Sequence, residues 1–152
     1  MITAADFLVF CRRTIAGIEE TVERIGDAHI NVRPDLPGVS TPYQLATHTF
    51  AAATFWCAHV VCGRPTSRVR DDEFVAVGTV DELRARAQDL VALLEELAPE
   101  MATATELANP PPQTQNPLEG EWTVGAALIH AYEELAQHLG HLEMTADVLL
   151  AA

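Results

Sequence analysis

The chain contains no lysine: its nine basic residues are all arginine, against 22 acidic residues and a net charge of −13. A surface this acidic repels phosphate backbones and anionic lipid, so we expect no nucleic acid and no membrane surface as partners. Aromatic residues are also scarce, at 6% of a chain that is 49% hydrophobic. The core must therefore consist mainly of Ala, Leu and Val, and with few β-branched runs this composition favours packed helices.

Paired cysteines are missing as well. The three cysteines, Cys11, Cys57 and Cys62, are odd in number and have no CxxC spacing, which indicates buried thiols in a reducing cytoplasm. The N-terminal stretch places an acid before its apolar run and arginines after it, the reverse of a secretory signal. We therefore expect a cytoplasmic protein. The apolar stretch 45–62 contains two histidines and has no flanking aromatic belts, which favours a buried helix over a membrane span.

Four helical segments can be recognised from their start signals and apolar periodicity. Each begins at a threonine that can serve as the N-cap, at positions 3, 41, 79 and 123, and two of these open a capping box. The connections between them are long, at about 14 to 16 residues, which is unusual for a simple up-and-down arrangement. We predict a single domain over residues 1–152 with an all-α fold, a four-helix bundle with at least one possible crossover.

One segment concentrates chemistry-bearing side chains. HAYEELAQHLGH, residues 130–141, places His130, Glu134, His138 and His141 within an arc of roughly 80° on one helix face. Glu134 and His138 are one turn apart, the spacing by which one helix offers two ligands to one ion. The residues beside them on that face are apolar or small, so a carboxylate there needs a compensating cation. His130 and His141 lie about 16 Å apart along the axis and cannot both join one site.

A third ligand has to come from another helix. His48 is the strongest candidate, because it lies on a mostly apolar stripe two turns into the second predicted helix. His59 shares the stripe but lies about 16 Å further along, and we interpret it and His29 as ordinary hydrogen-bonded histidines. Two imidazoles and one carboxylate are the ligand set of catalytic zinc, with positions left open for water or substrate.

Two stretches, TPYQLATHTFAAATFW (41–56) and EWTVGAALIHAYEELAQHLGHLEMTADVL (121–149), resemble the DinB-like superfamily. The resemblance is closest to the branch that contains the metal-binding domain of mycothiol-dependent maleylpyruvate isomerase. It implies the DinB/YfiT-like bundle topology, with a long crossover between the second and third helices. It also implies metal ligands at His48, Glu134 and His138. Zinc is the usual ion, although nickel also occupies such sites.

The resemblance and the open ligand set together predict a metal-dependent enzyme that uses a low-molecular-weight thiol such as mycothiol as cosubstrate. The reaction would transfer the thiol to an electrophile or assist an isomerisation. We expect His141 or His130 to act as catalytic residues that accept the thiol proton or orient a ligand. Two alternatives stay open: a metal-dependent hydrolase with the same ligands, and a non-catalytic, stress-associated metal-binding domain.

Further expectations concern the aromatic residues, the oligomeric state and the arginines near the predicted site. Phe55, Trp56 and Trp122 are interpreted as core or dimer contacts rather than a substrate pocket, and we expect a homodimer. Three arginines follow the second predicted helix: Arg64, Arg68 and Arg70. They could bind a substrate carboxylate, but we favour the interpretation that they lie in a solvent-exposed loop.

Overall fold

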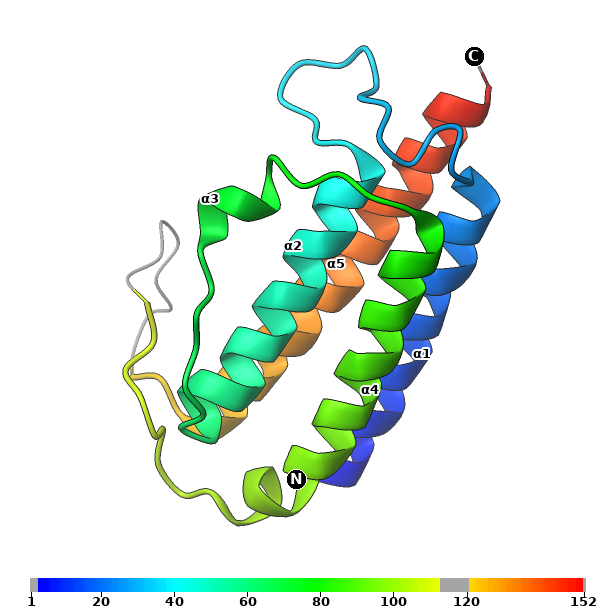
Figure 1. Ribbon diagram of the computed structural model, residues 1–152. Helices are drawn as coiled ribbons and strands as arrows, with labels where there is room; N and C mark the ends of the chain where they lie inside the picture. The colour runs from blue at the N-terminus through cyan, green and yellow to red at the C-terminus, as the bar shows by residue number, and fades with distance from the viewer. Residues whose placement is uncertain (1–2, 113–120, 152) are drawn as a thin grey trace.

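The computed structural model describes residues 3–112 and 121–151, and over these ranges every regular element is a helix (Figure 1). The all-α prediction is confirmed. The elements are α1 (Ala4–Ile25), α2 (Pro42–Thr54), the π-helix η1 (Phe55–Val61), α3 (Arg70–Glu73), α4 (Val80–Thr103) and α5 (Val124–Leu150).

Each of the four long helices begins after the threonine that the sequence indicated. The hydroxyl of each threonine accepts a hydrogen bond from the backbone N–H three residues further on, which satisfies one of the unpaired donors at a helix N-terminus. In three of the four, a side-chain oxygen at that third position accepts a hydrogen bond from the backbone N–H of the threonine, so that a full capping box forms. The caps are Thr3, Thr41, Thr79 and Thr123, the last without the return bond.

The long helices lie side by side around one core (Figure 1). Helix α1 packs against α4 and α5, and α2 also contacts both α4 and α5. The interior is aliphatic, as the scarcity of aromatic residues predicted, and its fully buried members include Ile15, Leu94, Leu135 and Leu142. The α1–α5 contact is close at Gly17, where an added Cβ would lie 2.9 Å from a methyl group of Leu139. Glycine therefore lets Leu139 lie directly on the α1 backbone.

Three features of the chain path were not predicted. The helix that begins at Pro42 continues to Val61, but its last seven residues form the π-helix η1, a geometry that is rare and often found at functional sites. The connection after η1 contains the short helix α3. Helix α4 runs through Pro99 to Thr103, whose hydroxyl donates to the carbonyl oxygens of Pro99 and Glu100.

The apolar stretch 45–62 lies largely within the core as part of α2 and η1. Among the described residues, no helix is both long enough and apolar enough to cross a membrane.

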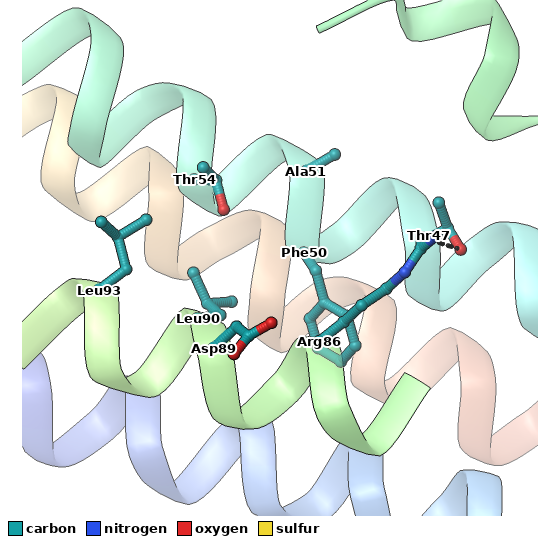
Figure 2. Close-up of a pocket in the computed structure, with 8 residues that line it drawn as sticks. All are labelled: Thr47, Phe50, Ala51, Thr54, Arg86, Asp89, Leu90 and Leu93. Carbon is teal, nitrogen blue, oxygen red and sulfur yellow. Dashed lines mark hydrogen bonds between the residues drawn. The ribbon is translucent and has the colours of Figure 1, made fainter. Parts of the chain in front are cut away.

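A hollow of about 340 Å³ lies between α2 and α4 (Figure 2). Arg86 extends from α4 across the hollow, and its guanidinium donates to the Thr47 hydroxyl of α2 over 3.3 Å. The hollow is lined by Thr47, Phe50, Ala51, Thr54, Arg86, Asp89, Leu90 and Leu93. None of the histidines singled out by the sequence lines it.

All three cysteines are free thiols in helical or adjoining segments. Cys11 and Cys57 are fully buried, whereas Cys62 is partly exposed. Burial raises the pKa of Cys11 to about 12, and raises that of Cys57 well above its ordinary value. The pKa of Cys62 is also raised, first by burial and then by the nearby Glu100 carboxylate.

Alkylation should therefore separate the three cysteines. At pH 8 the thiolate fraction of Cys11 and Cys57 is negligible, because their pKa values are raised and only the thiolate reacts. We expect iodoacetamide to label Cys62 slowly in the folded protein, and Cys11 and Cys57 only after unfolding in denaturant. Peptide mass spectrometry after timed labelling gives the rate at each position. Native labelling of Cys11 or Cys57 at the rate of Cys62 would show that these thiols are not buried as described.

Candidate metal centre

His48, Glu134 and His138 come together between α2 and α5. Each residue offers one ligand atom, and the three atoms lie within 4.8 Å of one another. His48 projects from the second turn of α2 and is buried, while Glu134 and His138 lie one turn apart on α5 and are partly exposed. The two helices lie side by side in Figure 1. The structure thus brings together the three residues that the sequence put forward as metal ligands; their binding of an ion stays a prediction.

The spacing of these atoms fits a metal ion better than a set of hydrogen bonds. Glu134 Oε2 lies 3.6 Å from His48 Nε2 and 3.3 Å from His138 Nε2, both long for a charge-assisted hydrogen bond. Ligand atoms that surround zinc tetrahedrally at about 2.1 Å are separated by about 3.4 Å. These two separations are close to that value, and all three ligand atoms lie within 4.8 Å of one another, so the three side chains are compatible with a divalent ion.

The electrostatics also suit a cation. The pKa of Glu134 lies well below its ordinary value because the imidazole of His138 and, next, that of His48 approach its carboxylate. Glu134 is therefore ionised at neutral pH, as a metal ligand has to be. The buried Nδ1 of His138 has no hydrogen-bond partner within the described part of the chain, which leaves this polar atom unsatisfied.

His130 lies beside Glu134 at the edge of the centre. Its Nε2 lies 3.5 Å from Glu134 Oε1, the oxygen that does not face the other two histidines, and its Nδ1 lies 3.0 Å from a carboxylate oxygen of Glu133. Because a carboxylate only accepts, Nδ1–H donates to Glu133, and Nε2 is the ring nitrogen on the side of the centre. His130 is thus a neighbour of Glu134 and stands outside the three-residue group.

Two tryptophans pack against the ring of His130. Trp56 of η1 and Trp122 stack on each other with centroids 4.7 Å apart, and the His130 ring meets both edge-on at 4.6 and 5.5 Å. Trp56 is buried and belongs to the core, as the sequence indicated. The π-helix therefore helps to fix the position of His130.

His141 lies one turn beyond His138 and is exposed. Its ring centroid is 6.2 Å from that of His138 in a stacked arrangement. The structure places it beside the centre but not among the converging atoms. Its catalytic role, like that of His130, stays a prediction.

The segment after η1 contributes a residue that sequence reasoning missed. Glu73 of α3 is only 5% exposed, and its Oε2 lies 2.7 Å from His48 Nδ1. Arg68 binds the same carboxylate, with Nε 2.6 Å from Oε1 and Nη2 3.0 Å from Oε2. The solvated-loop interpretation is therefore wrong for Arg68, whose side chain is 17% exposed and already holds a carboxylate of the protein itself.

The other two arginines of this segment lie differently. Arg64 forms ion pairs with Glu100 and Glu96 of α4. Arg70 is exposed, and its guanidinium lies 5.1 Å from the centroid of the Phe74 ring. The three do not form a cluster around one anion. No local signal separated Glu73 from the exposed acids beside it in the sequence, because its burial depends on the fold.

The centre thus combines two imidazoles and one ionised carboxylate from two helices, an arrangement compatible with metal binding. The chain belongs to the DinB superfamily, whose family model matches residues 11–142, a range that contains all three residues. Comparison with curated proteins found no match, and neither did comparison with solved structures.

Proposed function

We propose that the chain binds one divalent metal ion, with zinc the expected ion and nickel an alternative, and uses it in the chemistry of a small thiol. The observation that carries the proposal is the separation of the ligand atoms of His48, Glu134 and His138, which suits a bound ion. Membership of the DinB superfamily supports it. We place the chain, as part of the same proposal, in the branch of the mycothiol-dependent isomerases. The four long helices are then the DinB-type bundle, with residues 62–79 as its crossover.

The chemistry that such an ion supplies is Lewis acidity, which favours the deprotonated form of a bound thiol or water at neutral pH. The three protein ligands leave room for an outside molecule, whereas a structural zinc site is closed by a fourth side chain. Within the described residues, the metal-binding group has three members.

The thiol has to come from outside the chain. Its own three cysteines have raised pKa values, and two are fully buried. A small thiol such as mycothiol is the expected cosubstrate, and a small electrophile is the expected acceptor. The homodimer expected from the sequence belongs to the proposal as well.

His130 is the residue best placed to take the thiol proton. Glu133 holds its Nδ1–H, so Nε2 can accept, and this atom lies on the side of Glu134. General bases need this combination of a free lone pair and a fixed orientation. His141 is more exposed, and with no hydrogen bond to its ring among the described contacts it is the second choice.

The test uses the cobalt-substituted protein and a small thiol such as 2-mercaptoethanol. We expect a sulfur-to-cobalt charge-transfer band that His138→Ala abolishes and that His29→Ala, a substitution in a loop away from the centre, leaves unchanged. With a chlorodinitrobenzene electrophile and the zinc protein, we expect the thiolate to substitute the chloride, forming a C–S bond and releasing chloride ion, well above the background rate.

Each alternative function predicts a different result. Thiol binding without acceleration would leave the non-catalytic metal-binding domain as the function. Hydrolysis of an activated ester without any thiol dependence would favour the metal-dependent hydrolase. An unchanged cobalt spectrum on addition of the thiol would overturn the thiol proposal.

A further inference from the structure

We propose that Glu73 is a positioning residue for His48: held by Arg68, its carboxylate fixes the tautomer and the orientation of the imidazole so that Nε2 faces Glu134 and His138. The inference rests on the proposed metal site and extends it to the segment between η1 and α4. It gives the short helix α3 a role in metal binding.

The hydrogen bond between Glu73 and His48 determines the tautomer. Glu73 Oε2 lies 2.7 Å from His48 Nδ1, and because a carboxylate only accepts, Nδ1 has to carry the proton. The nitrogen that is metallated is set by the hydrogen bond that the other nitrogen makes. Nε2 of His48 is then the nitrogen left for an ion, on the side of Glu134 and 3.6 Å from its Oε2.

Arg68 makes this arrangement electrostatically balanced. Its guanidinium bonds both oxygens of Glu73, at 2.6 and 3.0 Å, and the two side chains are 17% and 6% exposed. A buried carboxylate needs a cation close to it, and Arg68 supplies that charge. The charge of Glu73 is therefore balanced by Arg68, and the hydrogen bond from His48 Nδ1–H needs no second positive charge beside it.

The segment between η1 and α4 also packs against one face of the His48 imidazole. The ring of Phe74, which follows α3, packs on His48 with centroids 5.0 Å apart and planes tilted by 33°. Arg68 in turn lies 5.3 Å from the centroid of Phe55 in η1. Glu73 holds one edge of the imidazole and Phe74 one face, so the ring has little freedom to rotate.

Glu73 is not itself suited to be a fourth ligand. It approaches His48 at Nδ1, whereas Glu134 and His138 lie on the side of Nε2. The arrangement is that of a carboxylate behind a metal-binding histidine. Loss of such a carboxylate typically weakens metal binding about 10- to 100-fold.

The test compares zinc affinity in the full-length wild type, Glu73→Ala and Glu73→Gln by competition with a chromogenic chelator. We expect Glu73→Ala to bind zinc about 10- to 100-fold more weakly than the wild type. Glu73→Gln should recover part of the loss, because its amide oxygen can still accept from Nδ1–H. The matched control is Glu100→Gln. Glu100 of α4 binds Arg64, which lies in the same connecting segment as Glu73 and Arg68, but the Glu100–Arg64 pair includes none of the three proposed ligands. The zinc affinity of Glu100→Gln should equal that of the wild type.

A second readout does not need the metal. Nitrogen-15 NMR of the metal-free protein reports which nitrogen of His48 is protonated. We expect the Nδ1–H form in the wild type and in Glu73→Gln, and a mixture of tautomers in Glu73→Ala. A residue that only stabilised the fold would change unfolding without changing the tautomer.

The outcomes separate this inference from the proposed function. A wild type that binds no zinc would overturn the metal site, and the tautomer measurement would still decide whether Glu73 orients His48. Zinc binding that is equal in the wild type and in Glu73→Ala, with the same tautomer in both, would overturn the positioning role. If Glu73→Ala does not fold, Glu73→Gln decides the question alone. A zinc affinity equal to that of the wild type, together with a mixture of His48 tautomers in this variant, would overturn the positioning role of Glu73.

Discussion

Glu134→Ala and His138→Ala are each expected to lower zinc affinity about 100-fold or more, whereas His130→Ala should change it less than tenfold. Complete four-ligand zinc sites have binding free energies of about 10 to 16 kcal/mol, so one ligand accounts for about 3 kcal/mol, a factor of about 100. His130 approaches only the far oxygen of Glu134, at 3.5 Å. Elemental mass spectrometry of purified protein should find about one divalent ion per wild-type chain.

Control variants show whether a loss of metal is specific to the three proposed ligands. His29→Ala removes an imidazole from a loop that takes no part in the centre, and its metal content should equal that of the wild type. If stoichiometric metal survives both His48→Ala and His138→Ala, the centre lies elsewhere. If His130→Ala loses the metal while Glu134→Ala retains it, the ligand set on α5 is displaced by one turn.

Arg68→Met should destabilise the protein by about 3 kcal/mol. Removing one partner of a buried ion pair leaves the other charge uncompensated, which costs about 3 to 5 kcal/mol. The lower end applies here because Glu73 keeps its hydrogen bond with His48. Urea unfolding followed by circular dichroism measures the change, and hydrogen exchange at residues 70–73 shows whether α3 detaches first.

A double substitution and an exposed pair serve as controls. Arg68→Met combined with Glu73→Gln removes both charges and should recover most of the lost stability. Arg12→Met removes the partner of Glu95 in a pair whose side chains are about half exposed, and it should cost at most about 1 kcal/mol. If Arg68→Met costs no more than Arg12→Met, the carboxylate of Glu73 reaches solvent and is not held as described.

The features that the sequence predicted depend on local geometry. A threonine followed three residues later by Gln or Glu specifies a helix start within one turn, so Thr41 and Thr79 could be recognised directly. Glu134 and His138 had to share a face, because one helical turn fixes their spacing. His48 was the strongest candidate because it lies on an apolar stripe of the second predicted helix, whereas His59 lies about 16 Å further along.

The features that were missed depend on contacts between distant segments. Glu73 is preceded in the sequence by two exposed acids, and only its contact with His48, 25 residues away, distinguishes it. The π-helix has no local signal either. Its carbonyl oxygens at His59 and Val60 accept hydrogen bonds from the side chain and the backbone of Asn109, which lies beyond α4. Such contacts exist only after the chain has folded.

The distribution of the ligands over α2 and α5 has a kinetic consequence. His48 is separated from Glu134 and His138 by more than half of the chain, so the unfolded chain does not hold the three proposed ligands together. The complete set exists once these two helices have docked, which excludes the ion from the early steps of folding. An ion that binds only the native state stabilises it by about 2.7 kcal/mol when its concentration is 100 times the Kd. Stabilisation that forms only after the transition state for folding would slow unfolding and leave the folding rate unchanged, so an ion bound at the proposed site would lengthen the lifetime of the folded chain.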